Sequence, residues 1–144
     1  MRLVAAMPRK GFVVLAGGVR GPAGRDGAQG GEVATFIAGA VLSGHRALYS
    51  DGSVVRYASA DDPSSAERCV GIGLQAAGPG GEVLVRRAGL LIEPTWAWTP
   101  GPVFLAAGGT MSQTPPDGGA VLQLGVALDT ISLDVRIGTP ILLD

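Results

Sequence analysis

The residues whose side chains could do chemistry are few and scattered. His45 is the only histidine, so a metal site of several imidazoles would need three copies of His45 on the axis of a trimer. A serine-histidine-aspartate arrangement would have to use the same residue, and the sequence has no Gly-x-Ser-x-Gly turn. It also has no Gly-x-x-x-x-Gly-Lys-[Ser/Thr] phosphate loop. We therefore expect no catalytic residues, no cofactor and no metal.

A carboxylate and two aromatic rings come together at one place in the sequence. Glu93 lies close to Trp96 and Trp98. Exposed indole rings stack on sugars, so these tryptophans are candidate glycan or partner contacts; the competing interpretation is packing in a covering loop or subunit contact. Asp61 and Asp62 are typical of a solvated loop. A glycoside hydrolase would require Glu93 and Asp61 within about 5–10 Å of each other.

Glycine recurs at every third position over one short stretch, at Gly18, Gly21, Gly24, Gly27 and Gly30. This is the period of a collagen triple helix, in which three chains wind around an axis with no room for a Cβ atom. Pro22 stands in an X position and no serine interrupts the stretch, which favours a wound stalk over a flexible linker. The pattern predicts a homotrimer. Four triplets span only about 35 Å, so a neighbouring segment has to contribute to trimerisation.

The composition is that of a structured protein with many turns. The chain has 144 residues, 47% hydrophobic, with 24 glycines and 10 prolines, which indicates short strands separated by turns. A net charge of −1 gives no field that attracts nucleic acid or a membrane surface. The single Cys69 excludes an intrachain disulfide and is expected to be buried. We find no secretion signal and no membrane span, and expect a soluble protein.

After residue 31 the sequence favours β structure, and no stretch has a helical period of useful length. Residues 46–50 and 53–58 flank Asp51-Gly52, a type I′ turn pair, and predict a tight hairpin. Residues 68–76 and 82–88 predict a second hairpin, and residues 58–66 a polar loop. Further strands are expected at 11–15, 103–106, 111–114, 120–128, 131–137 and 141–143.

The second half of this region repeats the first. Residues 70–74 resemble residues 124–128, and residues 83–86 resemble residues 133–136. Each half therefore predicts about four strands. Closure of two such units on one another would remove sheet edges that promote aggregation. We expect an all-β fold, a small barrel or sandwich built from two similar multi-strand halves.

Several short segments carry a resemblance to known proteins: GHRA at 44–47, YASADDP at 57–63, VGI at 70–72, WAWTPGPVFL at 96–105, QTPP at 113–116, GVA at 125–127 and IGTPILL at 137–143. With these segments, residues from about 35 to 143 resemble small structural proteins encoded among the virion genes of tailed bacteriophages and prophages. Such chains often place a collagen-like stretch ahead of this domain. Here that stretch is short, which departs from a long projecting fibre.

The resemblance implies a non-enzymatic virion protein, a trimeric capsid decoration or head fibre, assembled in the cytoplasm of the bacterial host. Its partners would be two further copies of itself and the major capsid protein or another virion protein, with no nucleic acid and no membrane. Residues 1–17 would attach to the capsid, with Arg9, Lys10 and Phe12 as candidate contacts. Residues 18–31 would form the stalk and residues 32–144 a β-barrel-like head. The alternative is a receptor-binding tail-fibre tip that contacts host glycans through Trp96 and Trp98.

Overall fold

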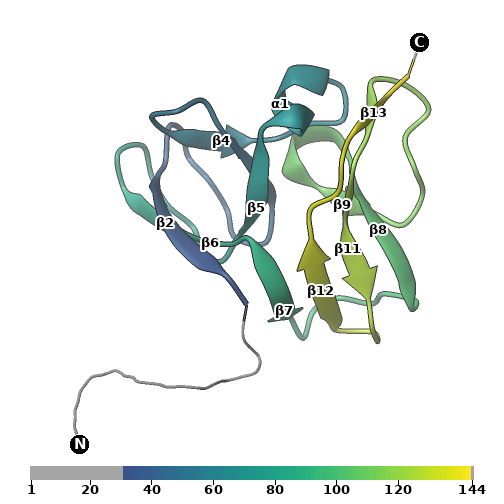
Figure 1. Ribbon diagram of the computed structural model, residues 1–144. Helices are drawn as coiled ribbons and strands as arrows, with labels where there is room; N and C mark the ends of the chain where they lie inside the picture. Colours follow the sequence, from purple (N-terminus) through teal and green to yellow (C-terminus); the bar gives the residue numbers. More distant parts are fainter. Residues whose placement is uncertain (1–30, 144) are drawn as a thin grey trace, which may run out of the picture. The chain divides into compact units, whose positions relative to one another are not determined.

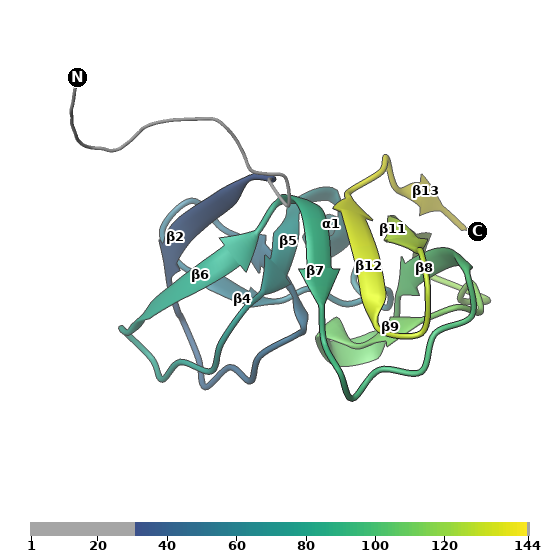
Figure 2. The same ribbon diagram turned by 90° about the horizontal axis from the view of Figure 1, so that it is seen from below.

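The computed structural model describes residues 31–143. The predictions for the strand at 11–15, the attachment residues and the triplet glycines fall outside these residues. The described part is an all-β domain, as predicted, with two five-stranded antiparallel sheets and one two-stranded sheet (Figures 1 and 2). Within it, no helix is long and apolar enough to cross a membrane.

The first sheet has the strand order β2-β6-β5-β3-β4. Its strands are β2 (Val33–Ile37), β3 (Ala47–Ser50), β4 (Val55–Tyr57), β5 (Cys69–Gly73) and β6 (Glu82–Arg86). In β6, Val83 and Val85 are buried whereas Glu82 and Leu84 are exposed. This alternation follows from successive side chains pointing to opposite faces of a strand.

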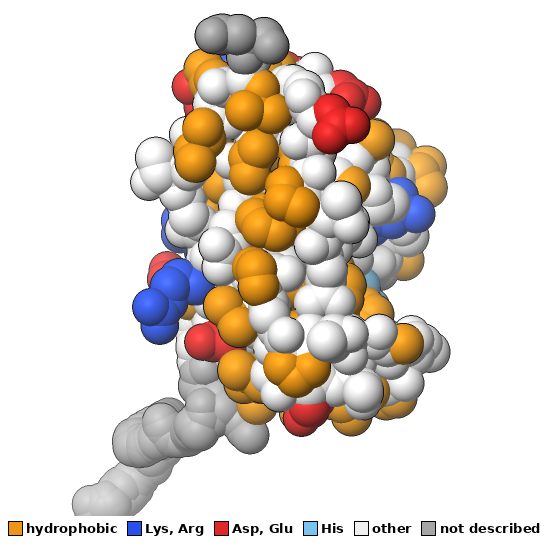
Figure 3. Space-filling model, turned by 90° about the vertical axis from the view of Figure 1, so that its right-hand side faces the viewer, with side chains coloured by type: hydrophobic (Ala, Val, Ile, Leu, Met, Phe, Trp, Pro, Cys, Tyr) orange, Lys and Arg blue, Asp and Glu red, His pale blue; other side chains and the backbone are white. Residues whose placement is uncertain are grey.

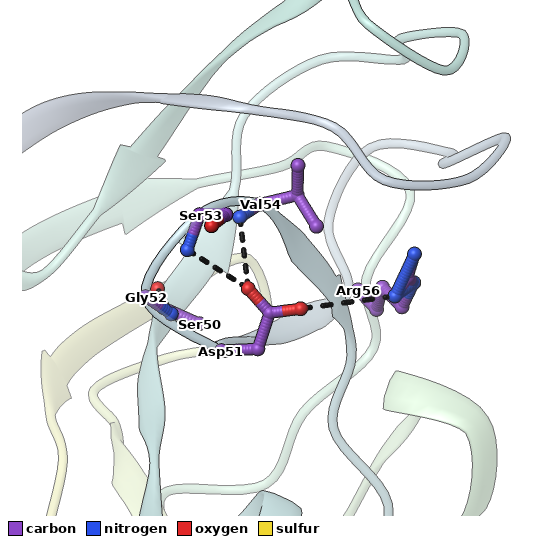
Figure 4. A network of polar contacts seen from close by, with 6 residues as sticks. All are labelled: Ser50, Asp51, Gly52, Ser53, Val54 and Arg56. Atoms are coloured by element: carbon purple, nitrogen blue, oxygen red, sulfur yellow. Dashed lines mark hydrogen bonds and ion pairs between the residues drawn. The ribbon is translucent and has the colours of Figure 1, made fainter.

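The first predicted hairpin is present as β3 and β4, but its turn is wider than expected. The strands pair as far as Ser50 and Val55, so four residues connect them. A type I′ turn needs positive φ at both central positions, and Asp51 is not among the described residues with positive φ. Instead, Asp51 Oδ1 accepts hydrogen bonds from the amides of Ser53 (2.8 Å) and Val54 (3.0 Å), as Figure 4 shows. The aspartate side chain therefore organises a four-residue loop.

The polar loop predicted at residues 58–66 contains a short helix, α1 (Pro63–Glu67). Pro63 occupies its first turn, where a proline costs no hydrogen bond and presets the backbone angle. The side chain of Ser65 is buried and donates to the carbonyl of Asp62 (2.8 Å). Five residues are too few to show a helical period, so the sequence did not indicate this helix.

The second sheet has the order β7-β12-β11-β8-β9. Its strands are β7 (Ala88–Ile92), β8 (Gly101–Leu105), β9 (Met111–Ser112), β11 (Gln123–Ala127) and β12 (Ser132–Arg136). A 3-10 turn (Ala107–Gly109) precedes β9, and β10 (Ala120–Val121) pairs with β13 (Ile141–Leu142). The chain passes from β6 to β7 through Arg87 alone, so no turn signal separates these two strands in the sequence.

The two halves share one strand order, and each has five strands rather than the four predicted. If β2, β3, β4, β5 and β6 are matched with β7, β8, β9, β11 and β12, the two sheets have the same order. A β-bulge also falls at the same place. Leu48 pairs with Gly71 and Tyr49 with Cys69, just as Val103 pairs with Gly125 and Phe104 with Gln123. Shared topology together with a shared bulge supports the predicted internal repeat.

Each half has buried apolar side chains of its own, which differs from two halves closing into one barrel. One cluster lies wholly in the first half and consists of Ala38, Leu42, Leu48, Val55, Val83 and Val85. The end of β2 bridges to β4 between Ala38 and Val55, so the first sheet curls around this cluster. The larger cluster combines residues of the second half with small first-half residues such as Ala47 and Ala58. It therefore packs the two halves together.

Candidate functional site

The segment that carries both tryptophans, residues 93–100, is fixed between β7 and β8. The amide of Glu93 donates to the carbonyl of Ile131 (2.9 Å), and the amide of Trp98 donates to the carbonyl of Thr130 (2.9 Å). Both acceptors lie in the turn between β11 and β12. The tryptophan segment is thus tied along its length to an adjacent hairpin.

A glutamine side chain fixes the other end of this segment. Oε1 of Gln113 accepts a hydrogen bond from the amide of Thr99 (3.0 Å), and Nε2 of Gln113 donates to the carbonyl of Thr99 (2.6 Å). These two bonds imitate the pairing that a β-strand would supply. The structure therefore assigns Gln113 a positioning role that sequence reasoning missed.

The two indole rings and His45 form one aromatic cluster. The ring centroids of Trp96 and Trp98 are 5.5 Å apart, and the His45 ring meets Trp96 edge-on at 5.7 Å. Both tryptophans are half-buried and pack against the larger core cluster. The Nε1 atom of Trp98 is buried without a hydrogen-bond partner in residues 31–143. The rings pack as the covering-loop interpretation predicts, and their contact with a glycan stays a prediction.

His45 and Glu93 add polar groups to this cluster, which we call the aromatic site: His45, Glu93, Trp96 and Trp98. Nε2 of His45 lies 3.8 Å from Oε1 of Glu93. The hydroxyl and amide of Thr95 donate to the other carboxylate oxygen. These two bonds, and then the nearby His45, lower the pKa of Glu93. The carboxylate is thus held in its charged, accepting form.

His45 reaches the site from the first half through an unusual backbone conformation. Its φ of 59° makes it the only non-glycine residue with positive φ among those described. Its amide donates to the carbonyl of Gly73 (2.7 Å), which ties this conformation to the end of β5. The contact between His45 and the tryptophans carries no short-range signal in the sequence, because it joins separate halves.

The aromatic site offers groups for hydrogen bonding and ring stacking. The polar partners of the Glu93 carboxylate within residues 31–143 are Thr95 and His45, and Asp61 is not one of them. Asp61 instead lies before α1, where its amide donates to the Ser59 hydroxyl (3.3 Å). In the described part of the chain, no group of three histidine, cysteine or acidic side chains is placed to hold a metal ion.

Cys69 behaves as a packed side chain. It lies on β5, is half-buried rather than fully buried as predicted, and packs against the larger core cluster. Burial raises the pKa of its thiol to about 11. A thiol that stays protonated at neutral pH is a poor nucleophile, so the prediction of a structural cysteine agrees with the environment found.

Large apolar side chains are exposed on the outside of both halves. Figure 3 shows a column of hydrophobic side chains over the side of the molecule that carries β8 and β13. The exposed large hydrophobic residues of the described part are Val33, Ile37, Val41, Leu84, Ile92, Val126, Leu128, Ile141 and Leu142. Large exposed apolar areas mark surfaces that bind other molecules.

Neither the models of known protein families nor the curated proteins contain a match to this chain.

Proposed function

We propose that this chain is a non-enzymatic structural protein of a tailed-phage-like virion, a homotrimeric capsid decoration or head fibre. The proposal depends above all on the five glycines at every third position, from Gly18 to Gly30, directly ahead of an all-β domain. It is supported by the exposed apolar side chains on both sheets, since assembling proteins keep such surfaces for their partners. The resemblance of residues 35–143 to virion proteins is the reason for placing the protein in a virion.

The triplet glycines test the trimer directly. Gly24→Val places a side chain at the crowded axis, whereas Ala23→Val makes a change of similar size at an outward-facing position of the same triplets. We expect Gly24→Val to lower the trimer fraction in a native mass measurement and Ala23→Val to leave it unchanged. Equal trimer fractions for both variants would contradict a wound stalk.

Residues 1–17 form the attachment segment in this proposal. Three copies of a weak contact act together on a symmetric lattice, because the second and third contacts form at high effective concentration. Deletion of residues 2–17 is therefore expected to remove the protein from purified particles while leaving its native mass trimeric. Substitution of Arg9, Lys10 and Phe12 by alanine tests the individual candidate contacts. Incorporation that persists after the deletion would eliminate this assignment.

The second candidate function is a receptor-binding tip that contacts host glycans. It is favoured by one observation: the aromatic site gathers a charged carboxylate, an imidazole and two indole rings, which are groups that hydrogen-bond and stack on sugars. A glycan array probed with the wild type and with Trp96→Ala tests it. Binding lost in the variant, with the trimer intact, would favour the tip; a silent array for the wild type would count against it.

A further inference from the structure

The outer face of β2 and β6 carries three exposed apolar side chains, and β2 is an edge strand. Val33, Ile37 and Leu84 point outward there, with exposed fractions of 42%, 39% and 39%; we call these three side chains the β2–β6 patch. Thr35 pairs with Leu84 across the two strands and continues the face. Glu82 and Arg86 are the charged residues of the paired segment, at its two ends.

Apart from the bridge between Ala38 and Val55 at its end, this edge lacks the usual protection against association. Natural edge strands carry charges, prolines or bulges that prevent another chain from pairing with them, whereas β2 reads Val-Ala-Thr-Phe-Ile. Its equivalent in the second half, β7, is also uncharged, but both ribbon views place β7 between the first sheet and β12 (Figures 1 and 2). β2 lies on the outside in both views. Within residues 31–143 the three side chains of the patch therefore remain exposed.

The position of β2 in the sequence indicates which molecule binds the β2–β6 patch. Val33 follows Gly30 by three residues, and three extended residues span at most about 11 Å. If the triplet glycines hold three chains around one axis, the first residue of β2 lies close to that axis in each copy. A domain of this size has a radius of gyration of about 13 Å, so contacts between copies close to that axis would first involve residues near the start of β2.

We infer that the β2–β6 patch is the contact through which the β domains of three copies associate around the axis that begins at the triplet glycines. This inference rests on the proposed trimer and assigns the surface that completes it. It also explains how three chains can associate although the triplet glycines at residues 18–30 form too short a stretch to hold them together alone. The apolar contact and the triplet stretch stabilise the same assembly from adjacent positions.

Two matched substitutions test this contact in the full-length chain. Leu84→Glu and Val126→Glu each place a charge at a strand position that is 39% exposed, the first in the patch and the second on β11 of the other sheet. At micromolar concentration we expect native masses of three times 14.5 kDa for the wild type and for Val126→Glu. Leu84→Glu should lower the trimer fraction at least tenfold. Circular dichroism and thermal unfolding of each variant establish that its fold is retained.

Cysteine crosslinking provides a measurement that does not depend on tolerating a buried charge. Thr35 and Thr130 are both exposed, and Thr35→Cys lies within the patch whereas Thr130→Cys lies on the turn between β11 and β12. Under mild oxidation, Thr35→Cys should form disulfide-linked dimers in high yield, and Thr130→Cys should not. Cys69 is common to both variants and does not affect the comparison.

The possible outcomes distinguish the proposed contact at the β2–β6 patch from the proposed trimer. A trimeric wild type, a dissociated Leu84→Glu and efficient crosslinking at residue 35 support the inference. A trimer that survives Leu84→Glu, with equal crosslinking at residues 35 and 130, overturns the patch and leaves the trimer standing; the patch then binds another occupant, such as residues 1–17 of its own chain. Equal dissociation by both glutamate variants also overturns the patch. A monomeric wild type refutes the proposed trimer together with the inference.

Discussion

Replacement of Gly125 by alanine is expected to destabilise the domain strongly, because the neighbouring strand leaves no room for a side chain. A Cβ atom at this position would lie 2.2 Å from the carbonyl oxygen of Asp134 on β12. Nonbonded atoms pack at about 3.5–4.0 Å, so the two central strands of the second sheet would have to move apart. Overpacking of this kind costs about 1–3 kcal/mol, occasionally more. We expect about 3 kcal/mol, because the obstacle is backbone rather than a movable side chain.

Gly118→Ala is the matched control, since a Cβ atom there would meet nothing within 4 Å. Its effect is expected to stay within about 0.5 kcal/mol. Urea unfolding followed by tryptophan fluorescence measures both variants, because Trp96 and Trp98 pack against the core. With a slope of about 1.5 kcal/mol per molar urea, the midpoints should differ by about 2 M. Protein concentration has to be equal in all samples, since the stability of an oligomer depends on it.

The internal repeat predicts that the equivalent substitution in the first half also destabilises the domain. Gly71 is the counterpart of Gly125 at the bulge, and a Cβ atom there would lie 2.2 Å from the carbonyl oxygen of Arg86. Gly71→Ala should therefore destabilise the first half in the same direction, with additional strain because its φ is +149°. Wild-type midpoints for both alanine variants would refute the close strand packing on which this reasoning depends.

Three further predictions follow from local contacts. Gln113→Ala removes both bonds to Thr99, at about 1 kcal/mol, and should speed hydrogen exchange of the Thr99 amide; unchanged exchange would contradict its positioning role. The amides of Val54 and Ser53, and then Arg56, hold the pKa of Asp51 below 3.8, so its contribution to stability is present above pH 3.8 and is lost as the pH falls through the folded-state pKa. Asp51→Asn should therefore lose less stability than the wild type between pH 5 and pH 2, measured by the urea midpoint, and an equal loss would contradict this. Cys69, with a thiol pKa of about 11, should react at pH 8 about 100-fold more slowly with a thiol reagent in the folded chain than in urea; equal rates would show an exposed thiol.

The sequence predicted those parts of the fold that depend on local signals. Alternating apolar residues and glycine-rich turns located the first two hairpins, and similar segments in the two halves anticipated a shared strand order. β7 was missed because Arg87 alone separates it from β6. Helix α1 was missed because five residues cannot show a helical period. In each case the deciding contacts are tertiary, and no local pattern reports them.

The aromatic site, too, could be predicted only in part from the sequence. Glu93, Trp96 and Trp98 are close in sequence, so their grouping could be predicted. His45 joins them from the other half through a positive φ, which no pattern indicated. Distances of this kind are set by the packing of the two halves, which sequence periodicity does not encode.

Electron cryo-microscopy of intact particles tests the central claim most directly. We expect three copies of this chain related by a threefold axis on the particle surface, with residues 18–30 wound together and Val33 of each copy nearest that axis. Single, separated copies on the particle, or particles without this chain, would contradict it.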